Sequence, residues 1–224
     1  MKKILTLGIV VVMLLACVGA VSAADLITNG GFESPINTQN WQVYPDGYSG
    51  LYWTIEQGIG PISEPTLEYQ TSGTLGLTPA GGDQYAELDS YANVNISQMV
   101  TLKKGITYHI SFAQTCRPQE SGGASILGVY LDGELLSSTT CEETLVWKTN
   151  TVDVTPAADI TAKLMFVDGG TTVQSYGVLL DDVKMEYEEN HQVPVPEFPT
   201  VALPAALIVG LIGAVFLIQK SKDN

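Results

Sequence analysis

Two adjacent carboxylates, Asp181 and Asp182 in the stretch YGVLLDDVKMEY, are well suited to hold a metal ion. Neighbouring carboxylates repel each other unless a positive group compensates them. Calcium is the natural candidate, because it accepts about six to eight oxygen ligands, backbone carbonyls included, in loose geometry. Glu33, in LITNGGFESP, could add a carboxylate, since Gly30 and Gly31 let the backbone approach closely. The competing interpretation is that both aspartates are solvated. The sequence alone does not show that Glu33 lies near Asp181 or Asp182 in space.

Two further stretches could bind a sugar, which offers apolar C–H faces and many hydroxyls to aromatic and planar polar groups. WQVYPDGYSGLYW is dense in aromatic residues, and DQYAELD combines a ring with carboxylates and an amide. In the second stretch, alternation puts Tyr85, Glu87 and Asp89 on one face and Gln84 on the other. For each aromatic ring the alternative is a place in the core, and for Arg117 it is an anchoring role in its loop. The candidate ligand-binding residues are Trp41, Tyr44, Tyr48, Tyr52, Trp53, Gln84, Tyr85, Glu87, Asp89 and Arg117.

Motifs of catalysis are missing from the sequence. It contains no G-x-S-x-G motif, no H-E-x-x-H motif and no catalytic pairing of Cys with His. A glycoside hydrolase would need two carboxylates a few ångströms apart. Among 24 acidic residues some pair is always available, so that feature carries little weight. We predict a protein without catalytic activity.

The segment between the two ends of the chain is strongly acidic. Residues 24–195 hold 22 of the 24 acidic residues but only six of the ten basic ones, a net charge near −16. This charge repels nucleic acid and anionic lipid and attracts divalent cations or basic surfaces, so nucleic-acid binding is set aside. Solubility in a salty exterior would explain most of these residues equally well.

The cysteines predict one disulfide bond. Removal of a signal peptide would take away Cys17 and leave Cys116 and Cys141, and an even pair in an exported domain favours a disulfide. The bond would close a loop of about 25 residues and add about 3 kcal/mol of stability in the chain-entropy model. A metal site or a catalytic thiol would need histidines nearby, and the chain has only His109 and His191.

The same segment has the pattern of an all-β domain. Helical periodicity is hard to find between residues 24 and 189, whereas short alternating or β-branched runs recur between Gly, Pro, Asn and Asp. Many short strands in an exported chain favour an antiparallel β-sandwich of two sheets, a jelly roll. Asn95 begins the one N-glycosylation sequon and indicates an exposed position. Strands are expected at residues 85–88, 94–102, 107–115, 125–131, 145–154, 160–167 and 175–187.

Alternation within these runs predicts which side chains face the core. In ITYHISFAQ, the even-numbered residues from 106 to 112 share the apolar face. Asp132 and Gly133 supply the positive-φ turn of a hairpin. In the last strand Leu180 and Val183 belong to apolar sets of opposite parity. A one-residue β-bulge at residues 181–182 would resolve that conflict.

The chain begins with the features of a secretory signal peptide. Lys2 and Lys3 precede an apolar stretch that ends at about residue 20, and the small residues of VSAAD offer an A-x-A-like cleavage site near Ala23. We therefore expect residues 1–23 to be a signal peptide and residues 24–189 to be one exported domain. An uncleaved amino-terminal helix and lipidation at Cys17 are the alternatives.

The chain closes with a proline-rich linker and an apolar segment. Residues 190–200 hold three prolines, which favour an extended, semi-stiff spacer. Residues 201–218 are uncharged and mostly apolar, near the minimum length of a transmembrane helix. Lys220 and Lys222 lie in the last segment, 219–224, which the positive-inside bias keeps in the cytoplasm. The sequence predicts a domain that lies outside the cell and is held at the membrane.

Four stretches of the domain resemble galactose-binding-like jelly rolls: LITNGGFESP, GGDQYAELDS, ISQMVTLKKGITYHISFAQTCRP and GVLLDDVKMEY. This group includes carbohydrate-binding modules of the xylanase and cellulase type, and an extracellular family of plants and bacteria of unknown function. The resemblance implies the jelly-roll fold over most of residues 25–189. It also implies that a structural calcium ion joins the first and last strands through Glu33 and either Asp181 or Asp182.

The tail VPEFPTVALPAALIVGLIGAVFLIQKSK resembles the PEF-CTERM sorting signal of surface proteins in methanogenic archaea. The resemblance implies that a membrane-embedded archaeosortase recognises and removes the tail, with transfer of the protein to a lipid as a further step. The alternative is a plain transmembrane tail. The residues that match the motif are Pro196, Glu197, Phe198 and Pro199, followed by the apolar span and the basic end.

These features predict an exported, membrane-anchored and non-catalytic cell-surface protein that binds carbohydrate of the envelope or extracellular matrix. A structural or adhesion component of the surface layer, with protein partners, is the alternative, and a glycoside hydrolase is the third. An exposed aromatic cluster beside Asn, Gln and Asp would favour sugar. A flat acidic face bridged by calcium would favour protein assembly.

Overall fold

The computed structural model describes residues 23–58, 65–118, 125–170 and 177–188, which form an antiparallel β-sandwich of two sheets. The predicted all-β architecture is confirmed. Sheet A has the order β10-β7-β12-β5-β4-β2, with β1 beside β12, and sheet B has the order β3-β6-β11-β8-β9. Sheet A consists of β1 (Ala23–Asp25), β2 (Trp41–Pro45), β4 (Thr66–Thr71), β5 (Gln84–Glu87), β7 (Tyr108–Cys116), β10 (Lys148–Val154) and β12 (Val178–Glu188). Sheet B consists of β3 (Thr54–Gln57), β6 (Val94–Leu102), β8 (Ile126–Leu131), β9 (Glu134–Thr140) and β11 (Ile160–Asp168).

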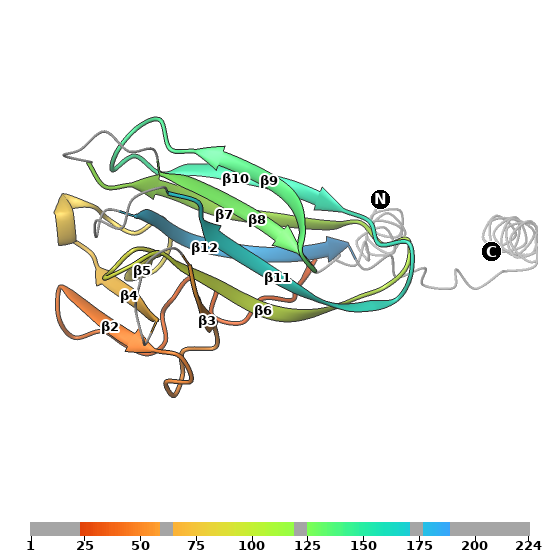
Figure 1. Cartoon of the computed structure of the whole chain (residues 1–224), viewed down its shortest axis with the longest axis horizontal. Coiled ribbons are helices and arrows are strands. Elements are labelled where there is room, and N and C mark those ends of the chain that lie inside the picture. Colours follow the sequence, from red (N-terminus) through yellow and green to blue (C-terminus); the bar gives the residue numbers. More distant parts are fainter. Residues whose placement is uncertain (1–22, 59–64, 119–124, 171–176, 189–224) are drawn as a thin grey trace, which may run out of the picture. The chain divides into compact units, whose positions relative to one another are not determined.

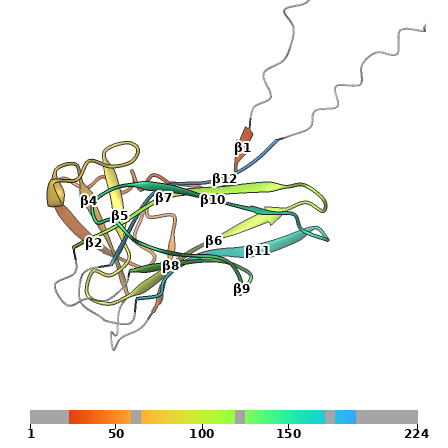
Figure 2. The same cartoon turned by 90° about the horizontal axis from the view of Figure 1, so that it is seen from above.

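The two sheets enclose the core between them. Figure 2 shows the layers from the side, with β7, β10 and β12 in one and β6, β8 and β11 in the other. Tyr108, Ile110 and Phe112 of β7 are all buried in this core, as alternation predicts. Phe112 meets Phe166 of β11 edge to face, with ring centroids 5.4 Å apart, and so joins the two sheets. Burial of apolar surface at about 25 cal/mol per Å² is the main force that holds the layers together.

The last strand contains the predicted β-bulge. The register of β12 against β7 shifts between Asp181 and Lys184, and Asp182 has a φ of 47°. The extra residue lets Leu180 and Val183 both reach the core, which strict alternation would forbid. The hairpin between β8 and β9 is confirmed as well, because Asp132 and Gly133 both have positive φ.

The strand predictions are incomplete in the first third of the domain and wrong at one boundary. Alternation predicts no strand between residues 41 and 71, where β2, β3 and β4 lie. In β4 the alternation is weak because the polar side chains of Glu68 and Gln70 point into a buried polar cluster and not towards solvent. The strand expected from residue 145 begins only at Lys148. Leu145 has a φ of 57° and donates its N–H to the carbonyl of Cys116, so it lies in a turn.

The two ends of the domain lie side by side. Ala23 of β1 pairs with Glu188 of β12, so the chain enters and leaves the sandwich at the same end (Figure 1). Apart from Ala23, the predicted signal peptide lies outside the described residues, as do the predicted linker, transmembrane helix and basic tail. Within the described ranges, no helix has the length and apolarity needed to span a membrane.

Candidate functional site

Three of the five aromatic residues predicted to contact a ligand in residues 41–53 reach the surface. Trp41, at the start of edge strand β2, is 51% exposed, and Tyr48 and Tyr52 in the following loop are 45% and 59% exposed. The ring of Tyr48 lies 4.9 Å from that of Tyr44, which fixes its position above the core. We call Trp41, Tyr48 and Tyr52 the aromatic platform.

The other two aromatic residues of this segment belong to the core, and their predicted role as surface contacts is wrong. Tyr44 and Trp41 are three positions apart on β2 and therefore face opposite sides of the sheet. The Tyr44 ring points inward, where it meets Tyr69 edge to face. Trp53 stacks on Phe32 at 5.6 Å and donates its indole N–H to the carbonyl oxygen of Asn29. Both rings therefore hold the loop against the sandwich.

The four candidates in and after β5 are also buried, which contradicts their predicted role as an open patch. Gln84 donates its amide to the carbonyl oxygens of Phe32 and Pro35, so it fastens the preceding loop. Tyr85 and Glu87 share a face, as predicted, but it is a covered one, and Asp89 is only 2% exposed.

A buried polar cluster accounts for Tyr85 and Glu87. The Tyr85 hydroxyl donates to Gln70 Oε1, and Gln70 Nε2 donates to Glu68 Oε1 and to Glu87. Arg117 Nη1 lies 3.2 and 3.1 Å from the two carboxylate oxygens of Glu87. Burial raises the pKa of Glu87 to about 8, with repulsion from Glu68 adding to it, and the attraction of Arg117 only partly offsets this rise.

A short segment, residues 72–81, packs against Tyr85 of this cluster. The carbonyl oxygen of Thr74 lies 3.1 Å from the Tyr85 hydroxyl oxygen, and the carbonyl oxygen of Thr78 accepts a hydrogen bond from the indole N–H of Trp147. Leu77 is buried with Tyr85 and Leu179 in a small apolar cluster of its own. The arrangement gives Arg117 an anchoring role, the alternative that its sequence context left open.

The carboxylates predicted to bind calcium converge on one loop. Glu33 Oε1 accepts the backbone N–H groups of Asp83 and Gln84 at 2.8 and 3.1 Å. Asp181 Oδ2 accepts the N–H of Gly81 at 3.0 Å, so residues 81–84 are held from both sides. Asp182 instead forms an ion pair with the neighbouring Lys184, at 2.8 Å.

The donor set at this loop fits a cation in part. Asp181 is fully buried, and that burial raises its pKa to about 7, with repulsion from Asp182 as a smaller cause. A cation would relieve both effects, and Glu33 and Asp181 are the residues that would hold it. In the ranges that the structure covers, no three His, Cys, Asp or Glu side chains form a group that could hold a metal ion. The calcium site therefore stays a prediction.

One pocket at the edge of the sandwich was not expected from the sequence. It lies beside the confirmed disulfide between Cys116 and Cys141 and has a volume of about 360 Å³. Trp147, at the end of the short apolar run in ETLVWKTN, is a signal that could have drawn attention to this segment, although it does not locate the pocket. The pocket is lined by Gln114, Thr139, Thr140, Cys141, Glu142, Glu143, Val146, Trp147, Lys148 and Asn150.

The predicted glycosylation site lies in the middle of sheet B. Asn95 pairs with Glu56 of β3 and Val167 of β11, and its side-chain oxygen is enclosed without a hydrogen-bond partner. The exposure that the sequon suggested is only partial, and glycosylation itself stays a prediction.

Comparison with known proteins adds two family matches. Residues 25–186 match the family described as "Protein of unknown function (DUF642)". Residues 195–213 match the PEF-CTERM archaeal protein sorting domain. A search of curated proteins finds no match.

Solved structures similar to this chain include several carbohydrate-binding modules. A family 61 module in complex with β-1,4-galactotriose is 19% identical, over 74% of this chain and 99% of that one, with a TM-score of 0.41. A family 22 xylan-binding domain from Paenibacillus barcinonensis is 11% identical, over 75% of this chain and 97% of that one, with a TM-score of 0.41. A family 4 module is 22% identical, over 72% and 99%, with a TM-score of 0.38.

Proposed function

Because this chain belongs to the DUF642 family and ends in an archaeal sorting domain, we propose that it is a cell-surface protein without catalytic activity that binds polysaccharide. The sorting domain supports export and display on the outside of the cell. The carbohydrate would come from the envelope or the extracellular matrix, and the aromatic platform would be the contact surface. A sorting enzyme of the archaeosortase type would be a second, transient partner.

The observation that carries this proposal is the exposure of three aromatic rings on one short segment. Aromatic rings of a small sandwich normally add to its core, and Tyr44 and Trp53 do so here. Trp41, Tyr48 and Tyr52 are left outside, where they present apolar faces that suit the C–H faces of sugars.

The backbone at Tyr52 supports a role in binding. Its φ of 63° lies in the left-handed region, which is unfavourable for a bulky side chain. Such a conformation costs about 1–3 kcal/mol and tends to persist where function requires it. Here it turns the ring of Tyr52 outward while Leu51 and Trp53 on either side are buried.

The charge of the domain favours a neutral sugar chain. Trp41 begins the five-residue strand β2 and Tyr48 lies in the turn after its end, so the two rings belong to different points of one segment. The strongly acidic domain would repel a polyanionic chain at low salt.

Retention on insoluble polysaccharides tests the proposal. The full-length chain, in a detergent without a sugar head group, would be passed over cellulose, xylan, chitin and cell-envelope polysaccharide. We expect retention on at least one of them, and loss of that retention in Trp41→Ala and Tyr52→Ala. Tyr91→Ala is the matched control, since Tyr91 is also 59% exposed but lies outside the platform. If all three variants lost retention equally, or if the native chain was not retained at all, the proposed role of the platform in binding polysaccharide would be refuted.

A second candidate function, assembly with a surface protein, rests on the outer face of sheet B. Tyr130 of β8 lies opposite Met165 of β11 and Leu135 of β9, and Leu135 is 51% exposed. Met99 on β6 adds a side chain that is 63% exposed. Met99 lies opposite Lys163, beside this apolar row rather than in it. Assembly would become the favoured function if no polysaccharide retained the protein and Leu135→Asp abolished its attachment to the surface layer.

A further inference from the structure

We propose that the pocket beside the disulfide is a second binding site, which holds a single uncharged sugar ring. It lies where β10, the edge of sheet A, and β9, the edge of sheet B, leave the side of the sandwich open. No residue of the aromatic platform lines it, so this inference does not depend on the proposed role of the platform.

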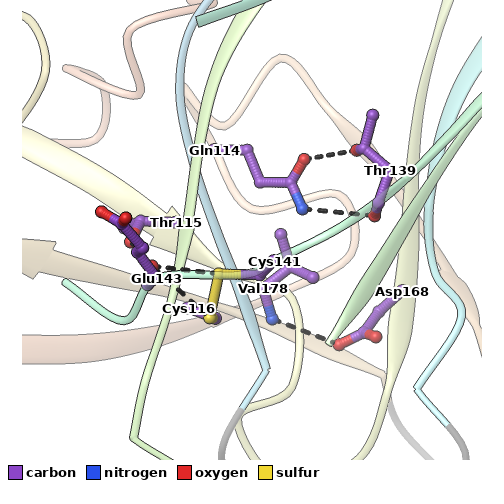
Figure 3. The surroundings of a disulfide bond; sticks show 8 residues. All are labelled: Gln114, Thr115, Cys116, Thr139, Cys141, Glu143, Asp168 and Val178. Atoms are coloured by element: carbon purple, nitrogen blue, oxygen red, sulfur yellow. Dashed lines mark hydrogen bonds between the residues drawn. A yellow bond between two sulfur atoms is a disulfide. The ribbon is translucent and has the colours of Figure 1, made fainter. Parts of the chain in front are cut away.

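The wall of the pocket is fixed before any ligand arrives. The disulfide ties Cys116, at the end of β7, to Cys141, just after β9, and so links the two sheets at this edge. Directly beside it, Gln114 and Thr139 face each other and exchange two hydrogen bonds, one to the Thr139 carbonyl oxygen and one from its hydroxyl (Figure 3). Gln114 is 4% exposed, and its amide has further donor and acceptor capacity.

Trp147 supplies the apolar surface that a sugar ring needs. Its indole N–H donates to the carbonyl oxygen of Thr78 at 2.7 Å, and its ring meets Tyr85 edge to face at 5.6 Å. Both contacts hold the side chain in place, so little conformational freedom would be lost when a ligand packs against it. Val146, which is 53% exposed, adds a further apolar group at the rim.

The remaining lining groups define the class of ligand. Thr140 and Asn150 offer hydroxyl and amide groups of the kind that pair with sugar hydroxyls. Glu142 and Glu143 outnumber Lys148, the one basic residue of the lining, so an anionic sugar or a phosphate would be repelled. The volume of about 360 Å³ lies at the lower end of ligand pockets, about 300–1,000 Å³. One neutral ring fits these properties.

Ligand-observed NMR of the full-length chain tests the site. The probes are D-glucose, D-galactose, N-acetyl-D-glucosamine and D-glucuronate at millimolar concentrations, in a detergent without a sugar head group. We expect saturable binding of at least one neutral sugar, and at least about fivefold weaker binding of glucuronate, the factor for one like-charge contact in water. The Trp41→Ala variant should bind the same sugar unchanged.

Two variants show whether binding occurs in the pocket. Trp147→Ala removes the apolar surface, and Val146→Trp blocks the rim at an exposed position where folding is not at risk. Both should lose binding, whereas Ile160→Trp, at the start of β11 and outside the pocket lining, should keep it. Undiminished binding in Val146→Trp, equal affinity for glucuronate, or no binding of any probe would overturn the proposal. If the native chain bound a monosaccharide but was retained on no polysaccharide, that result would count against the platform alone.

Discussion

Glu87 and Arg117 form an ion pair whose carboxylate is fully buried, while the guanidinium is about one-quarter exposed. Burial raises the pKa of Glu87 from 4.5 to about 8 although Arg117 lowers it. A carboxyl whose pKa is raised on folding stabilises the fold most when protonated. Its contribution is therefore complete below about pH 4.5 and is lost as the pH rises through about 8.

Replacing Arg117 should make this dependence on pH steeper. In Arg117→Met the pKa of Glu87 rises further, so at pH 9 the folded protein must either keep Glu87 protonated or bury its charge without a partner. We expect the free energy of unfolding to fall by about 2–4 kcal/mol at pH 9 and by clearly less at pH 6. Denaturant titration at both pH values measures this difference.

The matched control removes an ion pair at the surface. Lys103→Met breaks the exposed pair with Asp159 and should change the free energy of unfolding little at either pH, because water and salt screen an exposed pair. If Arg117→Met lost the same free energy at pH 6 and pH 9, the coupling between Arg117 and the titration of Glu87 would be disproved.

At this scale the sequence distinguishes poorly between a ring that binds and a ring that packs. Trp41 and Tyr44 lie in one short strand and face opposite sides, which alternation would have shown had β2 been recognised. Gln42 and Pro45 obscure that pattern. Tyr48 and Tyr52 lie in a loop without periodicity, so only the three-dimensional structure shows that both are exposed.

At the scale of the elements, the amino-terminal loop approaches the bulge of β12 closely at Gly30. Val183 donates its N–H to the Gly30 carbonyl oxygen at 2.9 Å, and a Cβ on Gly30 would lie 1.8 Å from the Val183 carbonyl oxygen. At Gly31 the nearest atom to such a Cβ is the flexible Glu33 side chain, at 3.9 Å. Two neighbouring glycines thus have opposite tolerance for a side chain.

This difference predicts a pair of substitutions with unequal effects. Gly30→Ala must push the loop away from the bulge and should cost about 3 kcal/mol or more of unfolding free energy. Gly31→Ala fills open space and should stay within about 1 kcal/mol of the native chain. Thermal and denaturant unfolding of the two variants gives the comparison. Similar losses in both would mean that the close approach of Gly30 does not constrain this loop.

Calcium, if bound, would act on the same contact between the first and last elements. We expect calcium to raise the melting temperature. At a hundredfold excess over Kd, binding would add about 2–3 kcal/mol to the free energy of unfolding. A chelator should reverse the effect, because Glu33 and Asp181 would again be held only by backbone N–H groups. Differential scanning calorimetry measures the shift.

Variants assign the effect of calcium to this loop. Glu33→Gln and Asp181→Asn should abolish the calcium-dependent shift, whereas Glu134→Gln, in the exposed start of β9, should retain it. A shift that persisted in both site variants would place the ion elsewhere, and no shift in the native chain would mean that the two carboxylates serve only as hydrogen-bond acceptors.

Element-level predictions succeeded where the sequence contains a strong internal conflict or a rigid turn. The parity change between Leu180 and Val183 predicted the bulge, and the Asp132–Gly133 pair predicted a hairpin. The boundary at residue 145 failed because an apolar run looks the same in a strand and in a turn. Trp147 is held by Tyr85 and Thr78, which are distant in sequence, so no local pattern could locate it.

The fold of the domain separates its point of attachment from its pocket. Val178 begins β12 beside Cys116, and Glu188 ends it beside Ala23. The strand has 11 residues, or about 35 Å at the rise of a β-strand. The disulfide and its pocket therefore lie about that far from Glu188, the last residue of the domain that the structure describes.

Processing of the tail is the prediction that concerns the whole chain. The sorting domain spans residues 195–213 and includes the predicted motif at Glu197 and Phe198. If a sorting enzyme recognises this motif, the mature protein from its native envelope should lack residues 201–224, and intact-mass measurement would show the loss directly. A chain with Glu197→Ala and Phe198→Ala should keep the tail, whereas Thr200→Ala should be processed normally. A native protein that retained residues 201–224 would establish the segment as a permanent anchor, because a recognised tail leaves the protein when it is sorted and a membrane-spanning tail does not.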